Sequence, residues 1–179
     1  VRDLLISRIS PDLDFAVPSN GIVLARKIAN ALHADFIPLD DERDTGRVIV
    51  INEDDSRIFL DFAVYRGANL EEDLRARDFT INALYYQPRK DQVLDFCDGV
   101  SDLRARLIRF LGNPTIRFEE DPVRMLRILR FAAKLGFAID DEIIAVLKPA
   151  LTQLLRDVSP HRLYDESQKM FSGGYLAPL

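Results

Sequence analysis

The chain changes character near residue 112, where mixed strand and helix patterns give way to helical periodicity alone. Before Gly112, short apolar segments alternate with turn residues and with one amphipathic segment at 21–32 that has helical spacing. After it, only helical spacing is seen, at 122–135, at 140–155 and from Ser159 onward. Elements segregated in this way are typical of an α+β fold. We therefore expect a mixed-sheet domain at 1–112 and an all-helical domain at 113–179.

The first of these domains is expected to contain several short strands. Their apolar patterns lie at 12–17, 36–39, 48–51, 58–65 and 93–96. The polar connection 52–56 predicts that the strands on either side of it pair, and the charged segment 40–47 is expected to be a mobile loop. The segment 73–86 is expected to be helical in its second half, and Ser101 to cap a short helix at 102–106.

The amino-acid composition limits the kinds of binding partner that can be expected. The net charge of −5 excludes wholesale electrostatic wrapping of nucleic acid, but arginines cluster between Arg104 and Arg130. Their guanidinium forks suit phosphate oxygens, so a nucleotide or nucleic acid is expected to be met locally. The two histidines, His33 and His161, are too far apart in the sequence to indicate a zinc site.

The cellular setting is inferred from what the sequence lacks. Cys97 is the single cysteine, so no internal disulfide can form and a reducing, cytoplasmic location is expected. No apolar run approaches the length of a membrane span, and no obligate protein partner is inferred. Because the chain opens at Val1 and stops at Leu179 without a helix end, we expect a fragment, truncated at both ends.

The segment from Asp121 to Lys134 carries the strongest chemical signal. Asp121 and Pro122 are typical of a helix start, and Gly136 of a helix end. On the helix between them, cations share the face opposite the apolar one, and no acidic residue is interleaved to neutralise them. Such a row repels itself unless an anion completes it, which predicts a phosphate site; a solvated basic face is the alternative. The cations are Arg124, Arg127, Arg130 and Lys134.

Asp12 and Asp14 stand two residues apart at strand spacing. They therefore point to the same face, roughly 6–7 Å apart along the backbone. Two carboxylates placed like this can hold a hard divalent cation such as Mg²⁺, which substrate phosphates commonly help to bind. The alternative is a pair of turn aspartates after Pro11 that bond to local amides.

Two further polar positions lie in apolar surroundings. Asp61 interrupts the apolar strand 58–65 and needs a cation, a metal or several donors. It is either a third metal-site carboxylate or the partner of an arginine such as Arg66 or Arg77. Asp78 and Asn82 are four residues apart, which would place them on one helical face, where they could accept from a ribose hydroxyl; helix capping by Asp78 is the alternative.

Taken in order, these segments resemble the class II RNA nucleotidyltransferases, the family of CCA-adding tRNA nucleotidyltransferases and bacterial poly(A) polymerases. Segments 1–5 and 12–14 are similar to the first family motif, and Arg77-Asp78-Phe79-Thr80-Ile81-Asn82-Ala83-Leu84 matches the second almost letter for letter. Segments 98–103 and 108–109 are similar to the third motif, and segment 120–132 matches the fourth. The resemblance implies a nucleotidyltransferase head domain at 1–112 followed by an incomplete helical neck domain at 113–179.

The resemblance also implies roles for individual residues. Asp12 and Asp14 would hold Mg²⁺ and activate the 3′-hydroxyl of an RNA. Asp61 is a candidate third catalytic carboxylate from its place in the apolar strand, not from the resemblance. Arg2 and Arg77 would contact the triphosphate, and Asp78 and Asn82 would lie near the ribose. Asp121 and Arg124 would read the base of the incoming nucleotide, while Arg127 and Arg130 would support the triphosphate.

Several functions stay open within and beyond this family. The implied activity is template-independent addition of nucleotides from CTP and ATP to an RNA 3′ end, with tRNA CCA addition favoured over poly(A) synthesis. The family's Gly-Gly, which would precede Val1, is not in the chain. A non-catalytic nucleotide- or RNA-binding fragment of the same fold is therefore a third interpretation. A dehalogenase-type phosphatase, which also uses an Asp-x-Asp motif, is disfavoured because its aspartates follow an apolar strand, whereas Asp12 follows Pro11.

Overall fold

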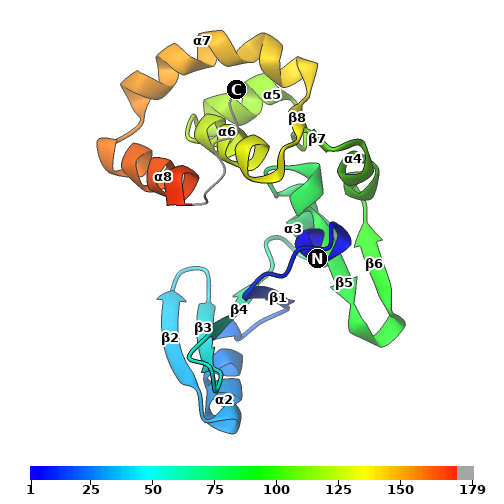
Figure 1. Cartoon of the computed structure of the whole chain (residues 1–179), viewed down its shortest axis with the longest axis vertical. Coiled ribbons are helices and arrows are strands. Elements are labelled where there is room, and N and C mark those ends of the chain that lie inside the picture. The colour runs from blue at the N-terminus through cyan, green and yellow to red at the C-terminus, as the bar shows by residue number, and fades with distance from the viewer. Residues whose placement is uncertain (173–179) are drawn as a thin grey trace. The chain divides into compact units, whose positions relative to one another are not determined.

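The computed structural model describes residues 1–172, with the side chains of 148–150, 152–155 and 172 left out of the description (Figure 1). Two compact units can be distinguished. One is Asp3–Asp73, and the other joins Val1–Arg2 to Leu74–Leu179. A short helix, α1 (Arg2–Leu5), begins the chain. Each unit is described separately below.

The Asp3–Asp73 unit is built on a mixed four-stranded sheet of order β1-β4-β3-β2. The edge strand β1 (Asp12–Val17) runs parallel to β4 (Arg57–Val64). β4 is antiparallel to β3 (Thr45–Ile51), which is antiparallel to β2 (Asp35–Asp40). The strand expected at 12–17 and the expected pairing of 48–51 with 58–65 are both confirmed.

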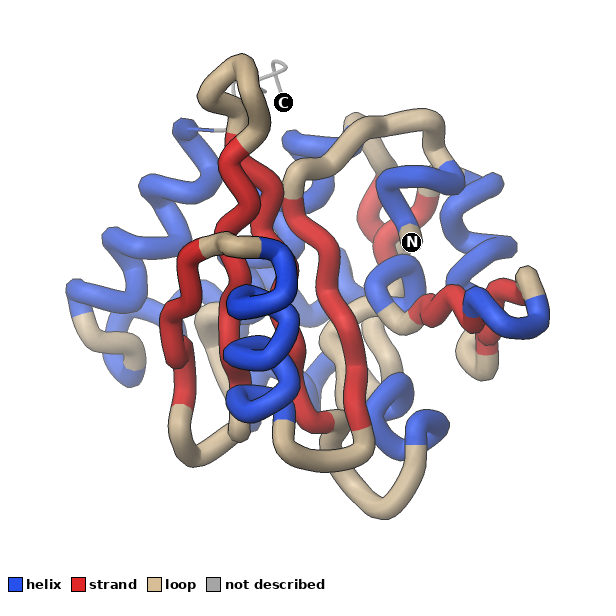
Figure 2. Tube along the Cα trace, turned by 90° about the horizontal axis from the view of Figure 1, so that it is seen from below, coloured by secondary structure: helices blue, strands red, loops and turns tan. Residues whose placement is uncertain are grey.

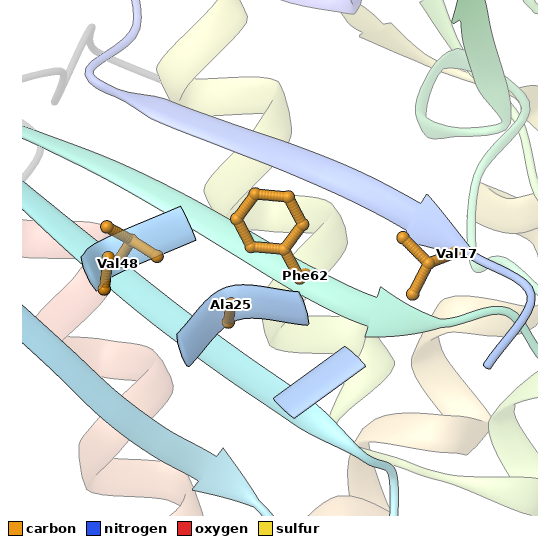
Figure 3. Close-up of a cluster of buried hydrophobic side chains, with 5 residues drawn as sticks. Val17, Ala25, Val48 and Phe62 are labelled. Atoms are coloured by element: carbon orange, nitrogen blue, oxygen red, sulfur yellow. The ribbon is translucent and has the colours of Figure 1, made fainter. Parts of the chain in front are cut away.

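One face of this sheet is covered by α2 (Gly21–Leu32), with the bounds expected from its periodicity (Figure 2). Between the helix and the sheet lie the side chains of the unit's buried core, four of which are labelled in Figure 3. The opposite face of the sheet is therefore left to the alternate residues of each strand. The core residues are Val17, Ala25, Ala29, Val48 and Phe62.

The segment expected to be a mobile loop, 40–47, is more ordered than that. A turn occupies 41–44, and β3 already begins at Thr45. The Asp44 carboxylate accepts the N–H groups of Gly21 and Ile22 at 3.0 and 2.9 Å, so it caps the first turn of α2. A Cβ at Gly21 would come within 2.2 Å of the Asp44 carbonyl oxygen, and only glycine fits there.

The other unit begins with a hairpin and short helical segments. After α3 (Leu70–Arg75) come the 3₁₀ turn η1 (Thr80–Asn82), the strand β5 (Leu84–Gln87), the turn η2 (Pro88–Lys90), the strand β6 (Gln92–Asp95) and α4 (Gly99–Ala105). The prediction of a helix in the second half of 73–86 is wrong, because the strand β5 lies there and pairs with β6. Ser101 lies inside α4, and the Asp95 carboxylate instead caps that helix through Gly99 and Val100.

The three helices expected after residue 112 are present as α6 (Arg124–Leu135), α7 (Asp141–Asp157) and α8 (Pro160–Ser172). A further helix, α5 (Pro114–Glu120), was not expected from the sequence. The region is not wholly helical, however, since β8 (Ala138–Ile139) pairs in parallel with β7 (Leu107–Ile108).

Aromatic side chains connect the two sides of residue 112. Phe79 stacks on Phe110 and meets Phe131 edge-on, with ring centroids 5.2 and 5.4 Å apart. Phe118 packs edge-on against Phe110 at 5.3 Å. Residues 74–111 are therefore part of the same compact unit as the helices, and the border between units falls at Leu74. The division into domains at 1–112 and 113–179 stays a prediction.

Candidate functional site

The face of the sheet opposite α2 presents carboxylates. Asp12 and Asp14 lie on β1 with exposed side chains, and Asp14 is the register partner of Asp61 on β4. Register partners point to the same side of a sheet, as do residues two apart on one strand. The structure thus brings Asp12, Asp14 and Asp61 to one face of the sheet, and their catalytic role stays a prediction.

Asp61 is tied to a residue that the sequence analysis did not single out. Arg47 on β3 is its register partner, and the guanidinium Nε and Nη2 each donate to a different Asp61 oxygen at 2.7 Å. Neither Arg66 nor Arg77, the partners considered from the sequence, appears in this pair. The hydrogen bond that Arg47 donates to Asp61 and the charges of Asp61, Asp12 and Asp14 outweigh burial and raise the pKa of Arg47.

The carboxylate face has the donor chemistry for a hard divalent cation. Mg²⁺ prefers oxygen ligands, and it is usually bound by one or two carboxylates together with water and substrate phosphates. Asp12 and Asp14 supply two such carboxylates, while both Asp61 oxygens are engaged by Arg47. Within the described part of the chain, no group of three His, Cys, Asp or Glu side chains is arranged to hold a metal ion. The residues therefore fit a cation held by two protein carboxylates.

In the other unit, the arginine face of α6 meets anions from the protein itself. Arg124 Nε donates to one Asp78 oxygen at 3.0 Å, and Arg127 Nη1 to the other at 2.6 Å. Arg124 also contacts Glu120 at 2.6 Å. Carboxylates of the protein therefore neutralise part of the arginine row, and the phosphate site predicted there stays a prediction. Glu120 lies four residues before Arg124, but Asp78 lies 46 residues before it, out of reach of any local pattern on α6.

Glu166 on α8 completes the network from the other side. Only 4% of this residue is exposed, and its carboxylate lies 3.1 Å from Arg130 Nε and 3.6 Å from Arg127 Nε. Neither contact has hydrogen-bond geometry, so both Nε atoms remain buried donors that lack a hydrogen-bond partner within the described structure. Glu166 is therefore joined to Arg127 and Arg130 by charge more than by directed hydrogen bonds.

The pKa values of this network reflect a balance between burial and opposite charge. Burial would raise the pKa of Asp78, but the hydrogen bonds and charges of Arg127 and Arg124 outweigh it and lower that pKa. Burial alone would lower the pKa of Arg127, and Asp78 overrides it, so that pKa is raised. For Arg130, burial prevails over the attraction of Glu166 and lowers the pKa.

The helix start expected at Asp121 and Pro122 is wrong, because Asp121 ends α5 and α6 begins only at Arg124. The Asp121 carboxylate accepts the Val123 N–H at 3.2 Å, so it supports the turn between the two helices. It also accepts from the Arg162 guanidinium of α8 at 2.9 and 3.1 Å. At the other end, Gly136 adopts the left-handed conformation, with φ of 66°, that was expected of a helix end.

The second motif lies beside this network in an extended segment and a 3₁₀ turn. Asp78 precedes the 3₁₀ turn that contains Asn82, so the two do not share a helical face, and Asp78 caps no helix. The Arg2 guanidinium donates to Asn82 Oδ1 and lies 5.1 Å from the centre of the Phe131 ring. Arg77 donates to the Tyr85 hydroxyl at 2.6 Å.

Two sets of predicted site residues can now be stated. The sheet face of one unit carries Asp12, Asp14 and Asp61, and the other unit carries the second and fourth motifs. Residues that sequence reasoning missed are Arg47, Arg117, Arg162 and Glu166. Arg47 could have been found as a charged residue among apolar neighbours in a strand, and Glu166 from its place in the amphipathic segment after Ser159. The convergence of the two sets around one nucleotide stays a prediction.

Two family models match the chain. Residues 63–109 match the poly(A) polymerase head domain, and residues 136–179 match the probable RNA and SrmB-binding site of polymerase A. Among curated relatives, poly(A) polymerase I of Escherichia coli O6:H1 is 50% identical over 107 residues, which is 60% of this chain and 23% of the relative. The CC-adding tRNA nucleotidyltransferase of Geobacter sulfurreducens is 38% identical over 178 residues, which is 99% of this chain and 40% of the relative.

Solved structures agree with these matches. A CCA-adding enzyme in complex with CTP superposes with a TM-score of 0.83 at 30% identity, over 99% of this chain and 43% of that one. A tRNA nucleotidyltransferase complexed with a primer tRNA and an incoming ATP analogue gives a TM-score of 0.80 at 35% identity, over 93% and 49%. This chain thus spans less than half the length of these proteins. No helix in the described residues is long and apolar enough to cross a membrane. Sequence and fold together place the chain in the RNA nucleotidyltransferase family of CCA-adding enzymes and poly(A) polymerases.

Proposed function

We propose that the protein adds nucleotides from CTP and ATP to the 3′ end of a tRNA. The observation that carries the proposal is the pair of exposed carboxylates on the sheet face, Asp12 and Asp14, whose register brings Asp61 to the same side. Nucleotidyl transfer is an in-line displacement at phosphorus that needs charge stabilisation and positioning more than covalent chemistry. A face of carboxylates that fits a divalent cation supplies the first requirement.

Each set of residues has a role in this proposal. When bound at Asp12 and Asp14, Mg²⁺ would polarise phosphate oxygens and make the RNA 3′-hydroxyl a better nucleophile. Arg2, Arg77, Arg127 and Arg130 would bind the triphosphate. Asp78 and Asn82 would accept from the ribose, and Asp121 and Arg124 would read the base edge. The guanidinium groups suit this because they are planar forks with several donors.

The choice of tRNA as substrate rests on the extent of the similarity. The match to the CC-adding tRNA nucleotidyltransferase runs through 99% of the chain, whereas the match to poly(A) polymerase I stops at 60%. Poly(A) synthesis is the second candidate because the identity over that shorter stretch is higher, at 50% against 38%. A cytoplasmic location is part of the proposal, because a chain with Cys97 as its single cysteine forms no internal disulfide, as is usual for proteins of a reducing compartment.

One experiment separates these products. The complete protein is given tRNA that lacks its 3′ end, together with all four nucleoside triphosphates and Mg²⁺, and the product is sized at nucleotide resolution. We expect growth that stops within three additions and requires CTP. A long ladder made from ATP alone would assign poly(A) synthesis instead. Binding of nucleotide with no extension of any RNA would contradict both activities and assign a non-catalytic binding role.

A further inference from the structure

Arg47 is the charged neighbour of the carboxylate face, and its contacts are unusual for a residue beside a cation site. Its guanidinium donates one N–H group to each Asp61 oxygen at 2.7 Å, which is the bidentate geometry that binds a carboxylate most strongly. The same guanidinium lies 5.1 Å from the centre of the Phe59 ring, and Phe59 is the register partner of Asp12. Arg47 therefore contacts Phe59 and Asp61, the two residues of β4 that are the register partners of Asp12 and Asp14.

The pair is neither fully buried nor fully exposed. About 31% of the Arg47 side chain and 19% of the Asp61 side chain are accessible. An ion pair of this kind contributes modestly to folding, since desolvation offsets much of the attraction. A divalent cation brings twice the charge of the guanidinium to the same carboxylate. The guanidinium and the divalent cation would therefore compete for Asp61, whose side chain is accessible enough for either to reach it.

Building on the proposed function, we propose that Arg47 is an internal counter-ion that competes with the catalytic divalent cation for Asp61. Without metal, the Arg47 fork holds Asp61 and neutralises part of the acidic face. A cation held by Asp12 and Asp14 would attract Asp61, which lies on the same face of the sheet, and would weaken its pairing with the guanidinium. Arg47 is thus a positioning residue that sets metal affinity.

The test measures binding of Mn²⁺ alone to the full chain, by the loss of the free-Mn²⁺ electron paramagnetic resonance signal. Arg47→Met removes the charge and keeps an apolar stem over Phe59. We expect it to bind Mn²⁺ about three- to tenfold more tightly, which is the size expected for removing a half-exposed bidentate partner. Arg26→Met is the matched control, because Arg26 also lies over an aromatic ring, Phe36, at 4.7 Å, and belongs to α2 on the covered face. The control should leave Mn²⁺ affinity unchanged.

A double-mutant cycle separates competition from a general effect of charge. In an Asp61→Asn background there is no carboxylate to compete for, so adding Arg47→Met should change Mn²⁺ affinity much less than it does in the wild type. An equal gain in both backgrounds would overturn the proposal and leave Arg47 as a source of simple repulsion. No gain in either background would assign the pair to structure.

Two further measurements separate a failure of this inference from a failure of the proposed function. If Mn²⁺ still binds to the double variant Asp12→Asn and Asp14→Asn, the metal site of the proposed function is wrong. If that variant loses Mn²⁺ binding but Arg47→Met does not change Mn²⁺ affinity, only the role of Arg47 is wrong. If Arg47→Met does not fold, the wild-type protein can be tested by NMR instead, because saturation with Mg²⁺ should shift the Arg47 Nε–H resonance. An Arg47 signal that does not move while Mg²⁺ binds would contradict the competition.

Discussion

Arg124 Nε donates to the Asp78 carboxylate over 3.0 Å, although 46 residues separate the two in the sequence. The second oxygen of the same carboxylate accepts from Arg127 at 2.6 Å. One carboxylate thus connects the second motif to the helix that carries the fourth. The arrangement orients two guanidinium groups before any nucleotide arrives, which lowers the cost of ordering them on binding.

Removing the charge of Asp78 should destabilise the protein. In Asp78→Asn, Arg124 and Arg127 keep their burial but lose their shared anion, which we expect to cost about 2 kcal/mol of the free energy of unfolding. Glu120→Gln is the control, because it removes a more exposed partner of the same Arg124 and should cost about 0.5 kcal/mol or less. Urea unfolding monitored by circular dichroism measures both. Equal losses in the two variants would contradict a structural role for Asp78.

The same carboxylate should give the protein part of its resistance to acid. The folded-state pKa of Asp78 is lowered from its ordinary value of 3.8, so its contribution is fully present above that value. It is lost as the pH falls from there through the depressed folded-state pKa. The free energy of unfolding of the wild type should therefore approach that of Asp78→Asn below about pH 4, after exceeding it at neutral pH. A difference between the two that stays constant down to pH 2.5 would show that Asp78 acts without its charge.

Much of the sheet could be predicted, because its signals are local. Turn residues and apolar spacing in the sequence predict both β1, a strand of six residues, and α2, a helix of twelve. The exposed pair Asp12 and Asp14 follows from the same two-residue period. Gly136 could be assigned to a helix end because few other residues adopt a positive φ without strain.

The failures come from contacts that join distant segments. Asp78 and Asn82 have helical spacing beside apolar residues, but Phe79 forms a bridge to Phe110 that keeps the chain extended there. Asp78 then lies against α6, where two arginines are its partners. Glu166 neutralises Arg130 from 36 positions further along the chain. No spacing rule within one helix can detect anions supplied by other elements.

Asp14 should be needed for activity and dispensable for folding. It lies exposed on an edge strand, so Asp14→Asn should change the free energy of unfolding by no more than about 0.5 kcal/mol. Loss of a metal-holding carboxylate should lower nucleotide incorporation by about a hundredfold or more, since the cation contributes several kcal/mol to the transition state. The control is Asp35→Asn, an exposed carboxylate on the opposite edge strand, β2. Labelled CTP incorporation into tRNA measures the rate, and unimpaired incorporation by Asp14→Asn would remove this residue from the catalytic set.

Arg124 should influence which nucleotide is chosen. A guanidinium fork discriminates between bases by the pattern of acceptors it meets, and Asp78 and Glu120 fix its orientation here. In Arg124→Gln the charge and the fork are lost, so the ratio of kcat/KM for CTP to that for ATP should move towards unity by about tenfold or more. Arg109→Gln is the matched control: this arginine pairs with Asp102 and Asp140, outside the network, and its removal should leave the ratio unchanged. A ratio that survives Arg124→Gln, with only the overall rate reduced, would assign Arg124 to holding α6 in place and leave base recognition to other groups.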